Sequence, residues 1–112
     1  MGEPQPLERL RRKLTIENLW LYVVSAILKH GPTYAYDVKK KIVQEYNIKP
    51  ATITVYTVIY RLEKEGILEK NPDATYKVTQ KGVEAYRNAI QLLKDVIEKL
   101  EAPLGKNRDP RL

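Results

Sequence analysis

Residues 34–66 read YAYDVKKKIVQEYNIKPATITVYTVIYRLEKEG, which contains two amphipathic helical patterns separated by a short turn. In the first pattern Tyr34, Val38 and Ile42 recur every four residues, with Tyr46 as a possible extension of the same buried face. Thr33 precedes them and is a residue type that caps helix N-termini. The sequence therefore predicts a helix that begins after Thr33 and buries these residues.

The second pattern begins beyond a turn at residues 47–49. Pro50 suits a first helical position and Gly66 suits the end of a helix, so a helix is predicted from near Lys49 to Glu65. Two helices joined by so short a turn predict a helix-turn-helix, a motif whose second helix can enter the major groove of DNA.

The two sides of the second helix differ in chemistry. On a helical projection of residues 50–65, the side predicted to be buried consists of Val55, Val58, Ile59 and Leu62. The opposite side consists of Ile53, Thr54, Thr57, Tyr60, Arg61 and Lys64, and Tyr56 lies at the boundary. Threonine and arginine can contact bases and phosphates, so this side is predicted to read DNA. The alternative is a surface helix without a binding role.

Lysines near the turn extend the predicted interface. Lys39, Lys40 and Lys41 precede the turn and Lys49 lies within it, where a helix-turn-helix meets the phosphate backbone; a solvated lysine run is the alternative. The complete set of predicted DNA-binding residues is Lys39, Lys40, Lys49, Thr52, Ile53, Thr54, Tyr56, Thr57, Tyr60, Arg61 and Lys64.

The segment before this motif is predicted to contain a core helix. Residues 1–14 form a flexible basic arm or a short helix, whose first six residues should be frayed. Thr15 offers an N-cap, and Gly31 with Pro32 ends the core helix. Its predicted buried stripe consists of Ile16, Leu19, Trp20, Val23, Val24, Ile27 and Leu28.

After Gly66 the pattern changes to a β-hairpin, in which strands near 67–70 and 75–79 flank a turn containing Pro72 and Asp73. A hairpin directly behind a helix-turn-helix is a wing, so residues 15–79 are predicted to form one winged DNA-binding domain. Thr79 is expected to cap a long C-terminal helix over residues 80–102, followed by a disordered tail at 103–112.

The long helix carries apolar residues at alternating steps of three and four. The predicted dimerisation residues are Val83, Tyr86, Ile90, Leu93, Ile97 and Leu100. A second stripe consists of Ala85, Ala89, Leu92 and Val96. Two apolar stripes exceed what a small domain can cover, which favours a seam between two copies over an intramolecular core. Leu7, Leu10 and Leu14 are expected to pack on this helix.

Composition limits the remaining functions. The chain has 112 residues, room for one core, and 20 Lys and Arg against 14 Asp and Glu give a net charge of +6, which suits a polyanionic partner. It contains no cysteine and a single histidine, His30, so we expect no enzyme, metal site or cofactor. No membrane-spanning segment or signal peptide is expected, which predicts a cytoplasmic protein.

Four stretches of the chain read GPTYAYDV at 31–38, TVY at 54–56, RLEKEGIL at 61–68 and YKVTQKG at 76–82. In this order and spacing they resemble the PadR family of winged-helix transcriptional regulators. It extends over most of the chain and implies a dimeric regulator, in which repression is the expected activity. The chain departs from the family pattern at Ala35 and Thr57, and its wing loop is nearly neutral where relatives often carry arginines.

The sequence as a whole therefore predicts a mainly α fold with a small β-hairpin wing, a winged helix-turn-helix with a long C-terminal dimerisation helix. The predicted function is a homodimeric repressor that binds double-stranded DNA at a pseudo-palindromic operator. The alternative is a winged-helix module for protein contacts in a transcription or RNA-processing assembly. A small aromatic effector near Trp20, Tyr22 or Tyr86 remains open as a further partner.

Overall fold

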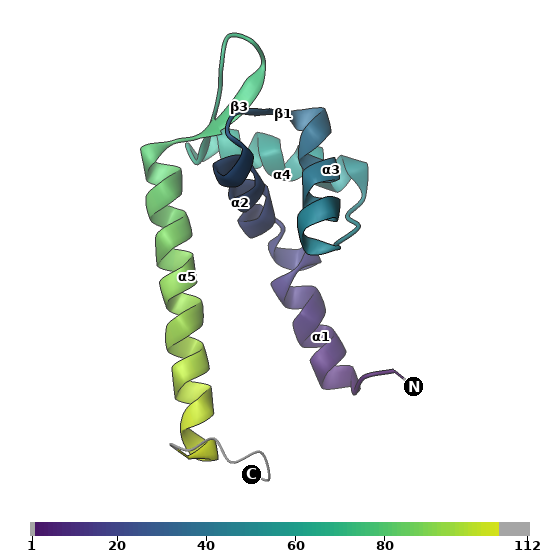
Figure 1. Ribbon diagram of the computed structural model, residues 1–112, viewed down its shortest axis with the longest axis vertical. Coiled ribbons are helices and arrows are strands. Elements are labelled where there is room, and N and C mark those ends of the chain that lie inside the picture. Colours follow the sequence, from purple (N-terminus) through teal and green to yellow (C-terminus); the bar gives the residue numbers. More distant parts are fainter. Residues whose placement is uncertain (1, 106–112) are drawn as a thin grey trace.

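The computed structural model describes residues 2–105 and is predominantly helical (Figure 1). Its elements in chain order are α1 (Gln5–Leu14), the 3-10 helix η1 (Ile16–Asn18), α2 (Trp20–His30), β1 (Thr33–Tyr34), α3 (Ala35–Tyr46), α4 (Thr52–Lys64), β2 (Leu68–Lys70), β3 (Thr75–Val78), α5 (Gln80–Glu101) and the 3-10 helix η2 (Ala102–Leu104). The fold is thus mainly α with a small sheet and a long C-terminal helix, as predicted.

One apolar core joins α2, α3, α4 and the sheet. The predicted inner face of α4 is buried, with Ile59 fully inaccessible to solvent, and α3 contributes Val38 and Ile42. The remaining buried apolar residues come mainly from α2 and from β2 and β3. The hydrophobic periodicity therefore identified the core face of α4 correctly, and in α3 it identified Val38 and Ile42. Tyr46, the possible extension of the α3 face, is 36% exposed and does not belong to the core.

The sheet has a third strand that the sequence patterns did not predict. Its order is β1-β3-β2 with both pairs antiparallel, and Thr33 of β1 lies opposite Tyr76 of β3. Thr33 is therefore not the N-cap of α3, because its backbone extends in the strand and its hydroxyl donates to the carbonyl of Gly31 at 2.7 Å. The neighbouring Tyr34, predicted to be buried, is 37% exposed, since adjacent side chains of a strand point to opposite faces.

The beginning of the core helix also differs from the prediction. Thr15 makes no N-cap hydrogen bond; its hydroxyl donates instead to the carbonyl of Arg11 at the end of α1. The chain turns through η1 before α2 begins at Trp20. Ile16, in that turn, and Leu28, near the end of α2, are consequently exposed and do not belong to the buried stripe.

The turn between α3 and α4 is longer than predicted. Asn47 adopts the left-handed conformation, with φ of 54°, and its N–H donates to the carbonyl of Val43, which ends α3. Ala51 is extended and precedes the first helical residue, Thr52, so Pro50 lies outside α4 and its ring is buried. The predicted start near Lys49 was therefore too early.

The start of α5 is fixed against the loop before the wing. Thr79 caps this helix as predicted, because its hydroxyl oxygen accepts from the N–H of Gly82 at 3.0 Å. The same hydroxyl donates to the carbonyl of Gly66 at 2.6 Å, and Gly66 itself has a φ of 80°. A side chain at Gly82 would collide with the carbonyl oxygen of Ile67. The wing and α5 are thereby joined at one point.

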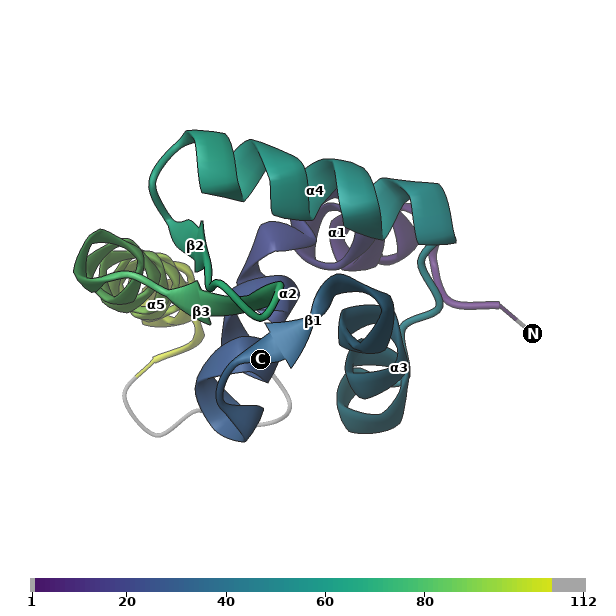
Figure 2. The same cartoon turned by 90° about the horizontal axis from the view of Figure 1, so that it is seen from above.

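The two terminal helices extend from this core. The radius of gyration is 16.5 Å and the longest dimension is 55 Å, whereas a compact chain of about 100 residues has a radius near 13 Å. Figures 1 and 2 show α5 beside the core at its first turns and alone beyond them. They also show α1 extending from the core at a place away from α5.

The two chain ends also depart in part from their predictions. Gln5 and Pro6 belong to α1, because proline fits the first turn of a helix, where its missing N–H has no partner to lose. Pro103 and Leu104 likewise belong to η2. The rest of the predicted tail, residues 106–112, lies outside the described residues.

Candidate nucleic-acid interface

The outward side of α4 presents a stripe with apolar and polar groups. Ile53 is 76% exposed and Tyr60 is 54% exposed, and Thr57 and Lys64 lie on the same side. The hydroxyl of Thr57 donates to the backbone carbonyl of Ile53 at 2.8 Å. We call Ile53, Thr57, Tyr60 and Lys64 the outer stripe of α4. Because the opposite face of α4 is sealed in the core, this stripe is free to contact a partner.

The remaining predicted residues of α4 lie on its flanks. Tyr56 is half-buried, with its ring centroid 6.1 Å from that of Tyr60. Thr52, at the first turn, accepts a hydrogen bond from Lys39 Nζ at 3.0 Å, which connects α3 to the N-terminus of α4. Thr54 is half-buried. These contacts hold α4 at both flanks.

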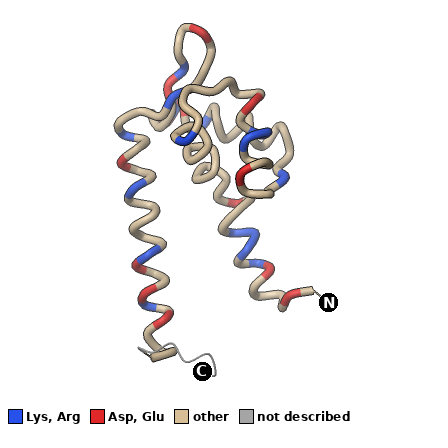
Figure 3. The backbone as a smooth tube through the Cα atoms, in the orientation of Figure 1, with Lys and Arg blue, Asp and Glu red and all other residues tan. Residues whose placement is uncertain are grey.

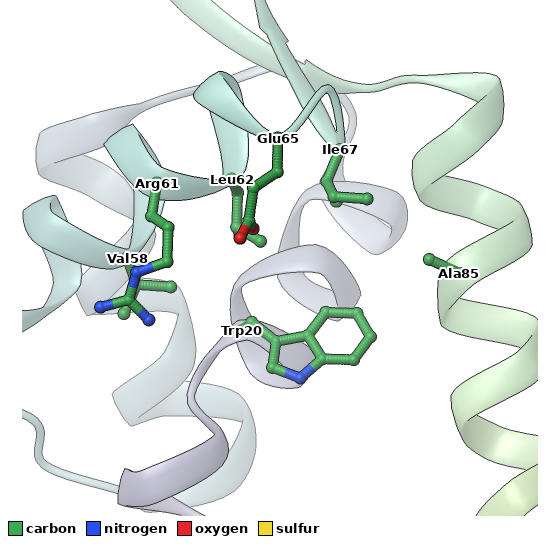
Figure 4. Close-up of a pocket in the computed structure, with 7 residues that line it drawn as sticks. All are labelled: Trp20, Val58, Arg61, Leu62, Glu65, Ile67 and Ala85. Carbon is green, nitrogen blue, oxygen red and sulfur yellow. The ribbon is translucent and has the colours of Figure 1, made fainter.

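Arg61 faces a cavity and not the centre of the outer stripe. The cavity has a volume of about 310 Å³ and is lined by Trp20, Val58, Arg61, Leu62, Glu65, Ile67 and Ala85. Figure 4 shows Arg61 and Glu65 extending from α4 toward the side where Trp20 lies. Arg61 is exposed and lies outside the buried face of α4, as the helical projection predicted, but on the flank beside Trp20 and not in the outer stripe.

The predicted phosphate-binding lysines differ in their surroundings. Lys40 and Lys49 are exposed, whereas Lys39 is half-buried and bonded to Thr52. Figure 3 shows basic residues on α1 and α3, while basic and acidic residues alternate along α5. The helix-turn-helix therefore carries exposed positive charge, at Lys40 on α3 and at Lys49 in the turn.

The wing is electrically balanced and tied to α4. Lys77 and Glu69 form a cross-strand ion pair at 3.8 Å, and hydrogen bonds from Thr75 hold the pKa of Asp73 below its usual range. Tyr76 is buried and donates to a carboxylate oxygen of Glu63 at 3.2 Å. Desolvation, with the nearby Glu63 charge, raises the pKa of Tyr76 to about 12. The hairpin thus packs on the flank of α4.

The predicted dimerisation residues divide into two groups. Val83, Tyr86, Ile90 and Leu93, the four nearer the N-terminus of α5, are half-buried. Three of these, Tyr86, Ile90 and Leu93, line a cavity with Leu21, Tyr22, Ser25 and Tyr46. Ile97 and Leu100, nearer the C-terminus, are 54% and 70% exposed. The apolar pattern of α5 is therefore partly an intramolecular contact and partly an exposed surface.

The leucines of α1 do not pack on α5 of the same chain. Leu7, Leu10 and Leu14 are each at least 40% exposed and line a surface groove with Arg11, Thr15 and Tyr22. Tyr22 donates to the carbonyl of Leu14 at 2.6 Å, which holds the end of α1 beside α2. Both views keep α1 and α5 apart (Figures 1 and 2). These leucines form an uncovered apolar stripe.

A pair of exposed tyrosines was missed by the sequence analysis. The rings of Tyr34 and Tyr36 stack with centroids 5.2 Å apart and planes at 9°. Tyr36 is 66% exposed at the first turn of α3. Recognising Tyr34 as a strand residue would have placed both rings outside the core.

Neither a metal-binding cluster nor a membrane-spanning helix is found among the described residues. They contain no group of three or more His, Asp or Glu side chains that could hold a metal ion. Within residues 2–105, none of the helices is long and apolar enough to cross a membrane.

Similar solved structures share this architecture. A winged-helix DNA-binding protein from STIV is 17% identical, with a TM-score of 0.61 over 74% of this chain and 94% of that one. A transcriptional regulator from Clostridium thermocellum is 22% identical, with a TM-score of 0.60 over 82% and 93% of the two chains. One from Thermotoga maritima is 25% identical, with a TM-score of 0.55 over 96% and 87%. No curated protein matches the chain.

The fold and its exposed α4 stripe define a winged helix-turn-helix protein, as expected. Residues 24–88, more than half of the chain, match the model of the transcriptional regulator PadR-like family. The chain belongs to the PadR-like family of transcriptional regulators, which confirms the resemblance seen in the sequence.

Proposed function

We propose that this protein is a homodimeric repressor that binds a pseudo-palindromic operator through α4 and occupies the promoter. The observation that carries the proposal is the outer stripe of α4, where Ile53 and Tyr60 are exposed on a helix whose other face is completely packed. In a helix-turn-helix this is the helix that enters the major groove. Repression is the activity that the family relationship favours, and the cytoplasmic location remains a prediction.

Contacts with the DNA backbone would come from the turn and from α3. Lys40 and Lys49 are exposed, Lys40 on α3 and Lys49 within the turn, and Lys39 is bonded to Thr52 at the N-terminus of α4. The first N–H groups of α4 have no side-chain cap, so a phosphate can accept from them. Such contacts orient α4 without reading sequence.

Dimerisation is supported by the uncovered stripes of α5 and α1. Beyond Leu93 the exposed apolar residues of α5 are Val96, Ile97 and Leu100, and their exposure in a single chain is costly. A two-fold dimer would bring two α4 helices to successive major grooves of a symmetric site. A small aromatic effector remains a prediction, with the cavity beside Trp20 as its proposed site.

The test is binding of the full chain to DNA at several salt concentrations. A duplex enriched from a random-sequence pool is labelled, and its fluorescence anisotropy is followed against protein concentration. Affinity should fall steeply as salt increases, because phosphate contacts release counterions. The variant with Lys40→Ala and Lys49→Ala should bind more weakly, with a log-log salt slope shallower by about 2.

The matched control carries Lys94→Ala and Lys99→Ala, which remove the same charge from exposed positions of α5, outside the proposed DNA interface, and sedimentation first checks that it associates as the unmodified protein does. It should keep the slope of the unmodified protein. If no duplex is enriched even at low salt, DNA binding is wrong and the alternative of a protein-contact module takes its place. If both double variants change the slope equally, the charge acts only through the overall field.

A further inference from the structure

The central part of the outer stripe of α4 offers methyl groups and few hydrogen-bond donors. Ile53 is the most exposed large apolar side chain among the described residues. The hydroxyl hydrogen of Thr57 is already used in its bond to the Ile53 carbonyl, which leaves the methyl group and the oxygen lone pairs. Two β-branched residues one turn apart therefore present an apolar surface at the middle of the predicted reading helix.

The residues that would recognise guanine or adenine are displaced from this surface. Between Thr52 and Lys64, α4 contains no Asn or Gln, and its one arginine, Arg61, lines the cavity beside Trp20. Bidentate recognition of guanine by Arg, or of adenine by Asn or Gln, is therefore not available at Ile53 or Thr57. At these two positions there remain apolar groups and one threonine oxygen that can only accept. For the apolar groups, the thymine C5-methyl group is the matching feature of the major groove.

The spacing of the two residues fits base pairs two steps apart. Positions four apart on a helix are separated by about 6 Å along its axis. Base pairs of B-DNA are separated by about 3.4 Å, so this distance corresponds to roughly two steps. Tyr60 lies on the same side of α4, beyond Thr57, and presents an exposed aromatic ring.

We infer that Ile53 and Thr57 select thymine in the operator by contact with its C5-methyl group. The inference rests on the proposed DNA-binding function and adds the base feature that α4 recognises. It assigns a specificity role to two side chains and leaves affinity for the backbone to the lysines.

The experiment compares thymine with deoxyuridine in the duplex enriched from the random pool. Deoxyuridine pairs as thymine does and lacks only the methyl group. Replacement of each contacted thymine should weaken binding of the full chain about fourfold, because the burial of one methyl-sized group is lost. Replacing the thymines of the selected site one at a time locates those that α4 contacts.

Variants assign the effect to the two residues. Thr57→Val keeps a methyl group and should remain sensitive to deoxyuridine, whereas Thr57→Ser keeps the hydroxyl bond and should lose that sensitivity at one thymine. Ile53→Ala should lose it at another. Ile53 and Thr57 are exposed, so thermal melting should show these variants folded.

The outcomes separate the two proposals. Failure to enrich any duplex overturns the proposed function. Tight binding that is indifferent to deoxyuridine overturns the methyl contact and leaves DNA binding intact. A deoxyuridine effect that persists unchanged in Ile53→Ala combined with Thr57→Ser overturns the assignment to these residues. Loss of the effect in that double variant, with retention in Thr57→Val, supports it.

Discussion

Helices α4 and α5 both expose apolar side chains, but only α4 is anchored along its length. Its inner residues Val55, Val58, Ile59 and Leu62 are all buried. In α5, which is nearly twice as long, the one buried residue is Gly82 in the first turn. Ile53 on α4 and Leu100 on α5 are nevertheless similarly exposed, at 76% and 70%.

The difference separates two reasons for an exposed apolar residue. On α4 the fold already holds the helix, so Ile53 and Tyr60 can be presented to a partner without being needed for folding. On α5 the apolar residues beyond Leu93 are exposed, and we expect the stability of this part of the helix to depend on what covers them. We therefore expect substitutions on the two helices to affect different measurements.

The largest effect is expected from the two isoleucines of α4. Ile59→Ala should lower the free energy of unfolding by about 2–5 kcal/mol, because Ile59 is completely buried and its loss leaves a cavity. Ile53→Ala is the matched control on the opposite face and should change it by less than about 0.5 kcal/mol. Urea unfolding at a fixed protein concentration measures both. Equal losses would show that the outer stripe also stabilises the fold.

A smaller effect is expected at the free end of α5. If a second copy covers this surface, the melting temperature of the unmodified protein should rise with protein concentration. Leu100→Ser should weaken that dependence, with a loss of about 1.5–3 kcal/mol of association free energy. Sedimentation equilibrium measures association directly.

Leu28→Ser is the control for that prediction, since Leu28 is an exposed leucine on α2 outside the proposed seam. It should leave association unchanged. A melting temperature that does not depend on concentration, together with a monomer at all concentrations, would contradict the dimer and require another partner for α5.

The first turn of α5 should tolerate no side chain at Gly82, where the helix meets the loop before the wing. Gly82→Ala gains about 1 kcal/mol of helix propensity, but its Cβ would lie 2.3 Å from the carbonyl oxygen of Ile67. Overpacking costs about 1–3 kcal/mol, so we expect a net loss of stability in thermal unfolding. Gly2→Ala, where the added Cβ has no neighbour within 4 Å, should be neutral. A stabilised Gly82→Ala protein would mean that α5 shifts freely relative to the wing.

The smallest effect concerns the contact between the wing and α4. The pKa of Tyr76 is raised from 10.0 to about 12, so the folded state keeps a proton that the unfolded chain loses between these values. The protonated Tyr76 hydroxyl therefore makes its full contribution to the free energy of unfolding below pH 10. This contribution is lost as the pH rises through 12. Between pH 10 and 12, urea unfolding should show a steeper loss for the unmodified protein than for Tyr76→Phe. Parallel pH profiles would contradict this contact.

The sequence alone determined the elements whose physical causes are local. Periodicity located the buried face of α4 and the buried Val38 and Ile42 of α3, Thr79 was identified as a cap, and a turn with Pro72 and Asp73 predicted the wing. Each of these depends on residues within a few positions of one another, which is why a single sequence contains the information. The motifs at 31–38 and 61–68 also pointed to the family.

Only the tertiary structure decided features that depend on distant partners. Thr33 became a strand residue because β3 pairs with it, and Arg61 lines a cavity together with Trp20, which is far away in sequence. The same holds for α5, whose regular apolar pattern looks uniform although only its first half has a core to contact. A local pattern indicates that an apolar side chain would be stabilised by burial. The arrangement of the whole chain decides whether other residues are present to bury it.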